Sequence, residues 1–210
     1  MARSTWYRLH DDRPLLGITT INWAEQNRSF KRQAIYETAL LDAARWFIEQ
    51  EGGRVVCLPQ VCGPSLMEED MLPARRIAAQ LGNASDALMV IETAPPTDVL
   101  HAAYGLTDLL IGTRMHSNIF ALTNGVPVVA IGYRHKTMGM MEMLGLERYV
   151  IDIAQVDSNT LTALLQAAWN EHATLRAQLP GHVGLLAARA RLAGHIIRAD
   201  YYVYQRQHER

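Results

Sequence analysis

The stretch that decides the fold is DLLIGTRMHSNIFALTNGVPVVAIGYRHK, residues 108–136. It opens with an apolar run typical of a buried strand, stops at residues 114–116, and resumes with the period of a helix that ends at residues 124–125. A second apolar run, residues 127–133, follows directly. A strand, a helix and a second strand with short connections predict two parallel strands joined by a crossover helix. The pattern also places an Arg-Met-His tripeptide where the first strand ends.

The same alternation runs through most of the chain. Six segments have the composition of buried strands, and they are residues 15–22, 54–60, 87–93, 108–114, 127–133 and 149–153. Helical periods follow them, at residues 32–53, 71–83, 95–106, 116–125, 136–146 and 159–178. This alternation predicts an α/β fold, a Rossmann-like parallel sheet of about six strands with helices on both faces. The buried face of the first helix is expected to contain Ile35, Ala39, Leu40, Ala43, Ala44 and Phe47.

Composition and charge restrict the possible functions. The chain has 210 residues, of which 49% are hydrophobic and 20% charged, and its net charge is -1. This balance is ordinary for a globular protein and gives no overall field that would attract nucleic acid or an anionic membrane. No stretch approaches the roughly 20 apolar residues of a membrane-spanning helix, and the first residues lack the apolar core of a signal peptide. We therefore expect a cytoplasmic protein with no nucleic-acid partner and no transmembrane segment.

The rest of the chain indicates one domain without a metal site. Cys57 and Cys62 have no second cysteine or histidine at metal-ligand spacing, so we expect two buried thiols and no metal. No repeat, low-complexity tract or linker interrupts the chain, which favours a single domain over residues 1–210. Residues 182–207 are helical in period and become basic and aromatic in YYVYQRQ. This segment is expected to pack on the domain as a C-terminal helix or to form an interface.

Basic side chains converge where the strands are expected to end. Ligands of open parallel sheets bind at the carboxyl ends of the strands. Three strand ends contribute polar or basic residues, namely Arg114 and His116; Arg134, His135 and Lys136; and Asn27, Arg28, Lys31 and Arg32. A helix N-terminus contributes about 0.3 to 1 kcal/mol to anion binding, a charge-assisted hydrogen bond contributes about 1.5 to 3, and micromolar affinity needs about 8. Taken singly, Arg114 would suit a surface salt bridge and His116 a helix start, but together they predict a phosphate and carboxylate clamp.

These motifs resemble a known family. Residues 108–146 combine Arg-x-His, a helix, Gly-x-Pro, a strand and a lysine, and they resemble the C-terminal signature of the polysaccharide pyruvyl transferases. GITTINWAEQNRSFKRQAIYETAL and VVCLPQVCGPS resemble the segments before that signature, so the resemblance covers residues 15–153. It implies one half of a two-domain fold similar to GT-B glycosyltransferases. The family's glycine-rich N-terminal half has no counterpart here, so the chain resembles the C-terminal, donor-binding half.

The resemblance also implies an activity. The family transfers pyruvyl from phosphoenolpyruvate to sugar hydroxyls as a ketal, in exopolysaccharides and cell-wall polymers. It implies phosphoenolpyruvate as the donor substrate, no cofactor, a glycan acceptor and, for full activity, a chain that supplies the acceptor domain. The implied general acid/base is His116, and the implied donor-binding residues are Arg114, Met115, Lys136 and Arg28. These roles suit the chemistry, because histidine exchanges protons near neutral pH and a small trianion requires a cationic clamp.

Two other functions remain open. A helix followed by Gly-Val-Pro-Val-Val is shared by the nucleotide-sugar domains of GT-B glycosyltransferases. Those domains usually begin this helix with a glutamate, whereas here it begins His116-Ser117-Asn118, which favours phosphoenolpyruvate. A non-catalytic remnant or partner subunit would also keep the same fold.

Overall fold

Six parallel strands form one sheet in the computed structural model, which describes residues 12–63, 65, 69–82, 87–93 and 95–208. The strands are β1 (Leu15–Thr19), β2 (Arg54–Cys57), β3 (Leu88–Val90), β4 (Leu109–Gly112), β5 (Val128–Gly132) and β6 (Val150–Asp152). Their order across the sheet is β3-β2-β1-β4-β5-β6, and all neighbours are parallel. Leu16 of β1 lies opposite Val55 on one side and Leu109 on the other. The expected parallel sheet is confirmed.

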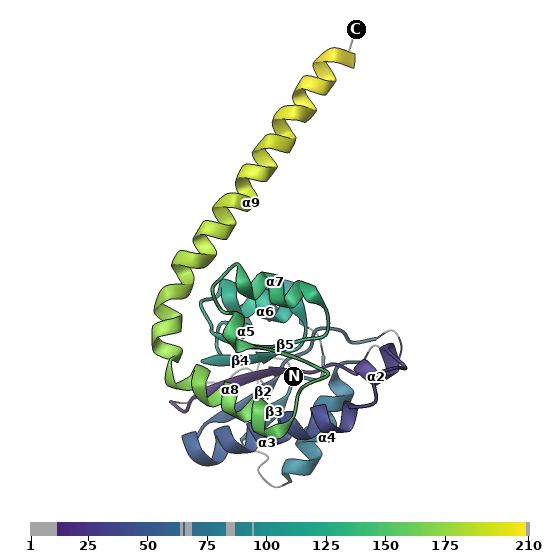
Figure 1. Ribbon diagram of the computed structural model, residues 1–210, viewed down its shortest axis with the longest axis vertical. Helices are drawn as coiled ribbons and strands as arrows, with labels where there is room; N and C mark the ends of the chain where they lie inside the picture. Colours follow the sequence, from purple (N-terminus) through teal and green to yellow (C-terminus); the bar gives the residue numbers. More distant parts are fainter. Residues whose placement is uncertain (1–11, 64, 66–68, 83–86, 94, 209–210) are drawn as a thin grey trace.

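Helices cover both faces of this sheet (Figure 1). One face carries α3 (Gln33–Glu51), α4 (Met71–Leu81) and α8 (Ser158–Asn170), and the other carries α5 (Thr97–Tyr104), α6 (Met115–Thr123) and α7 (His135–Glu142). A short helix, α2 (Trp23–Gln26), follows β1, and the 3-10 turn η2 (Glu147–Tyr149) precedes β6. Because helices cover both faces, β1, β2, β4 and β5 are buried along their whole lengths. This double burial explains why these strands are continuous apolar runs in the sequence.

The buried face of α3 is slightly rotated from the expected one. Ile35 is 42% exposed, whereas Tyr36 in the same turn is fully buried. The buried stripe runs from Tyr36 through Leu40 and Ala43 to Phe47, at the spacing of successive helical turns. Ile35 lies one residue away from this stripe, about 100° around the helix, and so faces solvent.

One of the two cysteines also differs from expectation. Cys57 belongs to β2 and is buried, as predicted, but Cys62 is exposed. The segment that follows β2 leaves the sheet at its carboxyl edge, so the double coverage that buries Cys57 does not extend to Cys62. Within the described chain, no group of three or more histidine, cysteine or acidic side chains is placed to hold a metal ion.

The C-terminal helix begins earlier than expected. The sequence predicted one helix to residue 178 and another from residue 182, whereas α8 ends at Asn170 and α9 (His172–His208) continues through Pro180. A proline removes one backbone donor from a helix, but α9 packs on the body on both sides of it, through Leu175 and Leu179 before and Leu186 after. Beyond this contact α9 projects from the body (Figure 1). Each described helix is too short or too polar to cross a lipid bilayer.

Some expectations concern parts of the chain outside the described residues. The predicted domain included residues 1–11, and the helix predicted at residues 71–83 included Asn83. In the YYVYQRQ stretch, residues 201–207, the exposed side chains that are described are those of Tyr201 and Tyr204. The alternative between packing helix and interface helix therefore stays a prediction for the distal part of α9.

Candidate active site

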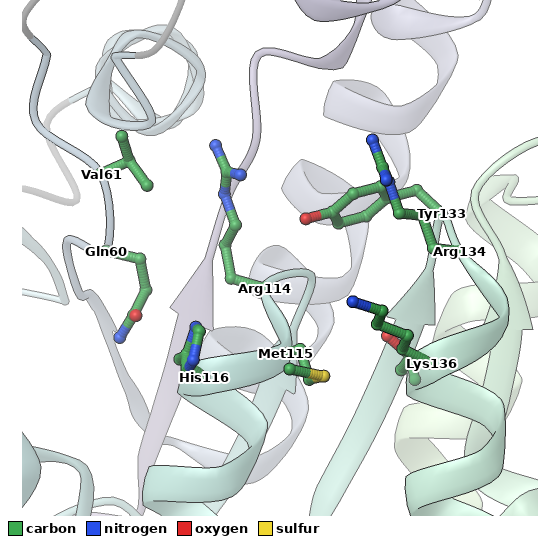
Figure 2. A pocket seen from close by; sticks show the side chains of 9 residues that line it. Gln60, Val61, Arg114, Met115, His116, Tyr133, Arg134 and Lys136 are labelled. Carbon is green, nitrogen blue, oxygen red and sulfur yellow. The ribbon is translucent and has the colours of Figure 1, made fainter.

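A cavity of about 350 Å³ lies at the carboxyl ends of β2, β4 and β5 (Figure 2). Its lining consists of Gln60, Val61, Arg114, Met115, His116, Tyr133, Arg134, Lys136 and Thr137. The chain leaves β1 towards one face of the sheet and leaves β4 towards the other, so the strand order reverses between these two neighbours. Ligand sites of open α/β sheets lie beside this reversal. The position of the cavity therefore agrees with the one expected for the site.

The structure brings together four of the five expected site residues. Arg114 is the N-cap of α6, Met115 and His116 begin that helix, and Lys136 lies in the first turn of α7. All four line the cavity. Arg28 is exposed in the connection between α2 and α3 and does not belong to the lining.

Of the other basic residues expected at this edge, some line the cavity and others do not. Arg134, the N-cap of α7, lines the cavity, whereas its neighbour His135 does not. Lys31 and Arg32 also lie outside the lining, and Arg32 instead donates a hydrogen bond from Nη2 to the Val156 carbonyl at 3.0 Å. The cationic cluster at the cavity is therefore Arg114, Arg134 and Lys136, which come from two neighbouring strand ends.

A buried carboxylate holds the Arg114 guanidinium. Nε of Arg114 donates to Oδ2 of Asp70 at 2.9 Å, and Nη2 donates to Oδ1 at 2.6 Å. The Asp70 side chain is 1% exposed and that of Arg114 is 15% exposed. The Oδ2 atom also accepts a hydrogen bond from the backbone N–H of Val61 at 3.2 Å. Arg114 thus connects a fully buried anion to the wall of the cavity.

The two groups of this pair affect each other's protonation. Burial raises the pKa of Asp70 above its usual value, although the hydrogen bonds from Arg114 act in the opposite direction. Burial favours the neutral form of Arg114 and is the largest single effect on its pKa. The hydrogen bonds to Asp70 and the negative charge of that carboxylate, with a smaller contribution from Tyr133, together outweigh burial and raise the pKa overall. Because arginine stays protonated in proteins and donates both hydrogen bonds here, we treat the pair as ionised near neutral pH.

Asp70 was not among the expected site residues. It lies 44 residues before Arg114, in an irregular segment whose path has no periodic signal. The signal that could have found it is the acidic run at residues 68–70, directly before a helical period. Such a run usually indicates a helix start, and Asp70 is indeed the N-cap of α4.

Buried hydroxyl groups join the ends of β1 and β4 beneath the cavity. Thr19 and Ser117 are hydrogen-bonded through Oγ1 and Oγ at 2.8 Å, and the Thr113 N–H donates to Thr19 Oγ1 at 3.1 Å. The Thr113 hydroxyl is in turn hydrogen-bonded to Tyr36 of α3 at 2.8 Å. All four side chains are fully buried. This network fixes the backbone on both sides of Arg114.

A close approach of α6 to the end of β4 completes this support. β4 ends at Gly112, and a Cβ atom there would lie 1.7 Å from Oδ1 of the buried Asn118. Glycine therefore lets α6 begin directly over the strand end. This short junction places His116 at the mouth of the cavity.

The polar ends of Arg114, Tyr133 and Lys136 lie around the cavity (Figure 2). Figure 2 shows the Tyr133 hydroxyl and the Lys136 ammonium facing the side on which Arg114 lies. The nearby Tyr133 hydroxyl contributes to the raised pKa of Arg114. His116 is exposed on the Gln60 side, and its ring makes no hydrogen bond to another described residue. The site can therefore bind a small polyanion and present an accessible imidazole to it.

Comparison with protein families places the chain in one of them. Residues 18–135, more than half of the chain, match the model of the polysaccharide pyruvyl transferase family. The chain therefore belongs to this family, as the sequence motifs indicated. The matched region includes Arg28, Arg114, Met115 and His116 and ends one residue before Lys136.

Individual relatives are longer than this chain. The amylovoran biosynthesis protein AmsJ of Erwinia amylovora is 33% identical over 92 residues, which are 44% of this chain and 21% of AmsJ. A UGT transferase from Siraitia grosvenorii, solved in complex with UDP, is 14% identical with a TM-score of 0.54, covering 86% of this chain and 41% of that structure. The spinosyn forosaminyltransferase SpnP is 17% identical with a TM-score of 0.48, covering 90% and 46%.

The solved structures bear on the fold alone. The likeness to the UGT transferase confirms the expected similarity to GT-B glycosyltransferases. The chain spans about a fifth of the curated relative and less than half of each of these two structures.

Proposed function

We propose that this chain binds the donor of a pyruvyl transferase, which moves pyruvyl from phosphoenolpyruvate to sugar hydroxyls as a ketal in polysaccharide or cell-wall biosynthesis. Membership of the family supports the reaction class. The observation that carries the proposal is the clustering of Arg114, Arg134 and Lys136 around one cavity in a chain whose net charge is -1. Such a local cluster suits a small, highly charged anion and gives no general attraction for polyanions.

The cationic side chains have distinct proposed roles. An arginine has five N–H groups, and Asp70 takes two of those of Arg114, so the other three remain for a donor carboxylate or phosphate. Lys136 and Arg134 lie at the start of α7 and would contact the opposite side of the anion. Met115 supplies an apolar contact between them, suited to the vinyl group. Arg28 would join this set only through a rearrangement of its connection.

His116 would handle the protons of the reaction. In the proposed step, the imidazolium gives its proton to the vinyl CH₂ of phosphoenolpyruvate, and a sugar hydroxyl forms a C–O bond with the adjacent carbon. The His116 imidazole, now neutral, accepts the proton of that hydroxyl, and phosphate leaves with the electrons of the C–O bond that breaks. A second sugar hydroxyl closes the ketal, and its proton goes to the departing phosphate. An exposed imidazole at a cavity that binds the donor suits proton transfer.

A nucleotide-sugar site is the main alternative. The shared fold does not decide between the two donors, because that likeness is at 14% identity. The family match and the His-Ser-Asn sequence in the first turn of α6, where a glutamate would be expected for a nucleotide sugar, favour phosphoenolpyruvate. The matched region is about a fifth of the curated relative, so we propose that a further domain, in the same protein or in another chain, supplies the site for the acceptor glycan. The cytoplasm remains the expected compartment, and no cofactor is part of the proposed reaction.

A thermal-shift comparison of phosphoenolpyruvate, UDP-sugars and inorganic phosphate tests the proposal. A ligand at a hundred times its Kd should stabilise the folded chain by about 2.7 kcal/mol. We expect such a shift with phosphoenolpyruvate alone. Lys136→Ala should reduce it, and Lys31→Ala is the matched control, because Lys31 is an exposed lysine outside the cavity lining. A larger shift with a UDP-sugar would favour the alternative.

A further inference from the structure

Asp70 is placed as a helix N-cap but does not act as one. An aspartate at this position usually accepts a hydrogen bond from a backbone N–H in the first helical turn. The Asp70 side chain makes no such bond to α4. Both of its carboxylate oxygens point to Arg114 instead. The Asp70 side chain therefore contacts Arg114 and does not stabilise the start of α4 through a capping hydrogen bond.

The burial of this ion pair is unequal. Asp70 is 1% exposed and does not line the cavity, whereas Arg114 is 15% exposed and does. Burying a carboxylate is costly, and a buried ion pair is weak evidence for a gain in stability. A pair of this kind has another use, because two parallel hydrogen bonds fix the plane of a guanidinium. The side of the guanidinium that Asp70 leaves unoccupied then has a defined direction.

Asp70 also connects Arg114 to another part of the cavity wall. Its Oδ2 atom accepts from the Val61 N–H, and Val61 and Gln60 line the cavity. Its backbone carbonyl accepts a hydrogen bond from the buried Thr20 hydroxyl at the end of β1. A single residue thus joins the end of β1, the segment after β2 and the arginine after β4.

We propose that Asp70 is the positioning residue of the donor site, which orients Arg114 towards the anion and holds it against the Gln60–Val61 wall. This inference rests on the proposed function for the identity of the anion. It assigns Asp70 no contact with the donor, because Asp70 lies behind Arg114 and outside the cavity lining.

Competition between Asp70 and the donor for Arg114 is the alternative role, and it predicts a different change in affinity. Asp70 is itself an anion, so if it merely competed with the donor for Arg114, removal of its charge would tighten donor binding. If Asp70 positions Arg114, the same change weakens binding, because Arg114 loses its orientation. The direction of the change in affinity therefore separates the two roles.

Calorimetric titration of phosphoenolpyruvate into the full chain and its variants provides the test. We expect Asp70→Asn and Asp70→Glu each to weaken binding about tenfold, similar to the loss of affinity when the hydrogen-bond partner that orients a metal ligand is removed. Asp70→Glu keeps the charge, so its effect isolates geometry. In an Arg114→Lys background, Asp70→Asn should add little, because the residue acts through Arg114.

Asp108→Asn is the matched control. Asp108 also pairs with an arginine, Arg176 at 3.1 Å, and also accepts a backbone hydrogen bond, from Leu15 at 2.8 Å. It lies directly before β4, at the amino end of the strand, whereas the cavity lies at the carboxyl ends of the strands. We expect this variant to keep the wild-type affinity, even if it unfolds at a lower temperature.

A second measurement follows the arginine directly. The Nε–H of Arg114 is donated to buried Asp70, so its NMR signal should exchange slowly with water in the wild type and faster in Asp70→Asn. If the wild type binds phosphoenolpyruvate and Asp70→Asn binds it equally well or more tightly, the positioning role is wrong. If the wild type itself does not bind, the proposed donor is wrong, and unchanged Nε–H exchange in the variant would then overturn the positioning role as well.

Discussion

His116 and Arg114 are two residues apart but differ in their surroundings. Arg114 is held by a buried carboxylate, and the His116 ring is exposed at the cavity. A binding group gains from being fixed, whereas a group that exchanges protons must reach both the substrate and a proton source. The environments of the two residues therefore suit the different roles proposed for them.

His116→Gln should separate binding from catalysis. Glutamine keeps similar size and polarity but cannot transfer a proton, so we expect phosphoenolpyruvate affinity within a few fold and transfer reduced about a hundred- to ten-thousand-fold. Phosphate release in the presence of an acceptor and an acceptor domain measures the transfer. His135→Gln is the control, because His135 is also exposed at a helix start but does not line the cavity. Unchanged turnover in His116→Gln would exclude its catalytic role.

The two cysteines should differ in reactivity. Burial raises the pKa of Cys57 from 9.0 to about 12, whereas Cys62 is exposed. Since the thiolate is the reactive form, a thiol reagent at pH 8 should label one thiol per native chain, and Cys62→Ser should abolish this labelling. Because the folded-state pKa of Cys57 is raised, this thiol should lower the stability of the fold as pH rises from about 9 to about 12. Equal labelling rates for both cysteines would contradict this structure.

At the scale of elements, the junction between β4 and α6 should tolerate no added side-chain atom. A Cβ at position 112 would lie 1.7 Å from Asn118 Oδ1 and 3.1 Å from Leu110 Cδ2, so Gly112→Ala should destabilise the fold by about 1 to 3 kcal/mol in urea denaturation. Gly184→Ala in α9 is the control. Nothing lies within 4 Å of its added Cβ, and alanine favours helix, so stability should be unchanged or rise by up to about 1 kcal/mol. Equal stabilities of the Gly112→Ala variant and wild type would show that α6 can shift without cost.

The ends of elements were harder to predict than their order. The strand predicted at residues 15–22 is β1, Leu15–Thr19, and the one predicted at 127–133 is β5, Val128–Gly132. A proline usually ends a helix, but Pro180 lies inside α9 because buried side chains hold the helix on both sides of it. Periodicity thus located the elements, and packing determined where they ended.

At the scale of the whole molecule, we expect the chain to bind its donor but to catalyse little transfer. The chain spans about a fifth of the curated relative, and the cations that line the cavity come from the starts of α6 and α7. Orienting the acceptor and excluding water can supply several kcal/mol of the barrier, and both need an opposite wall. We expect little ketal formation on a panel of glycans by the chain alone and more after addition of an N-terminal domain from the same family. Robust transfer by the chain alone would mean that residues 1–210 contain a complete site.

The sequence by itself determined the alternation of strands and helices, the parallel sheet, and the placement of Arg114, His116 and Lys136 at neighbouring strand ends. These features are local, because periodicity and the residue that follows a strand can be read within a few positions. Tertiary structure alone decided that Asp70 holds Arg114, that Arg28 lies outside the cavity lining, and that Cys62 is exposed. These three residues lie in irregular connections, whose paths follow from long-range contacts and leave no period in the sequence.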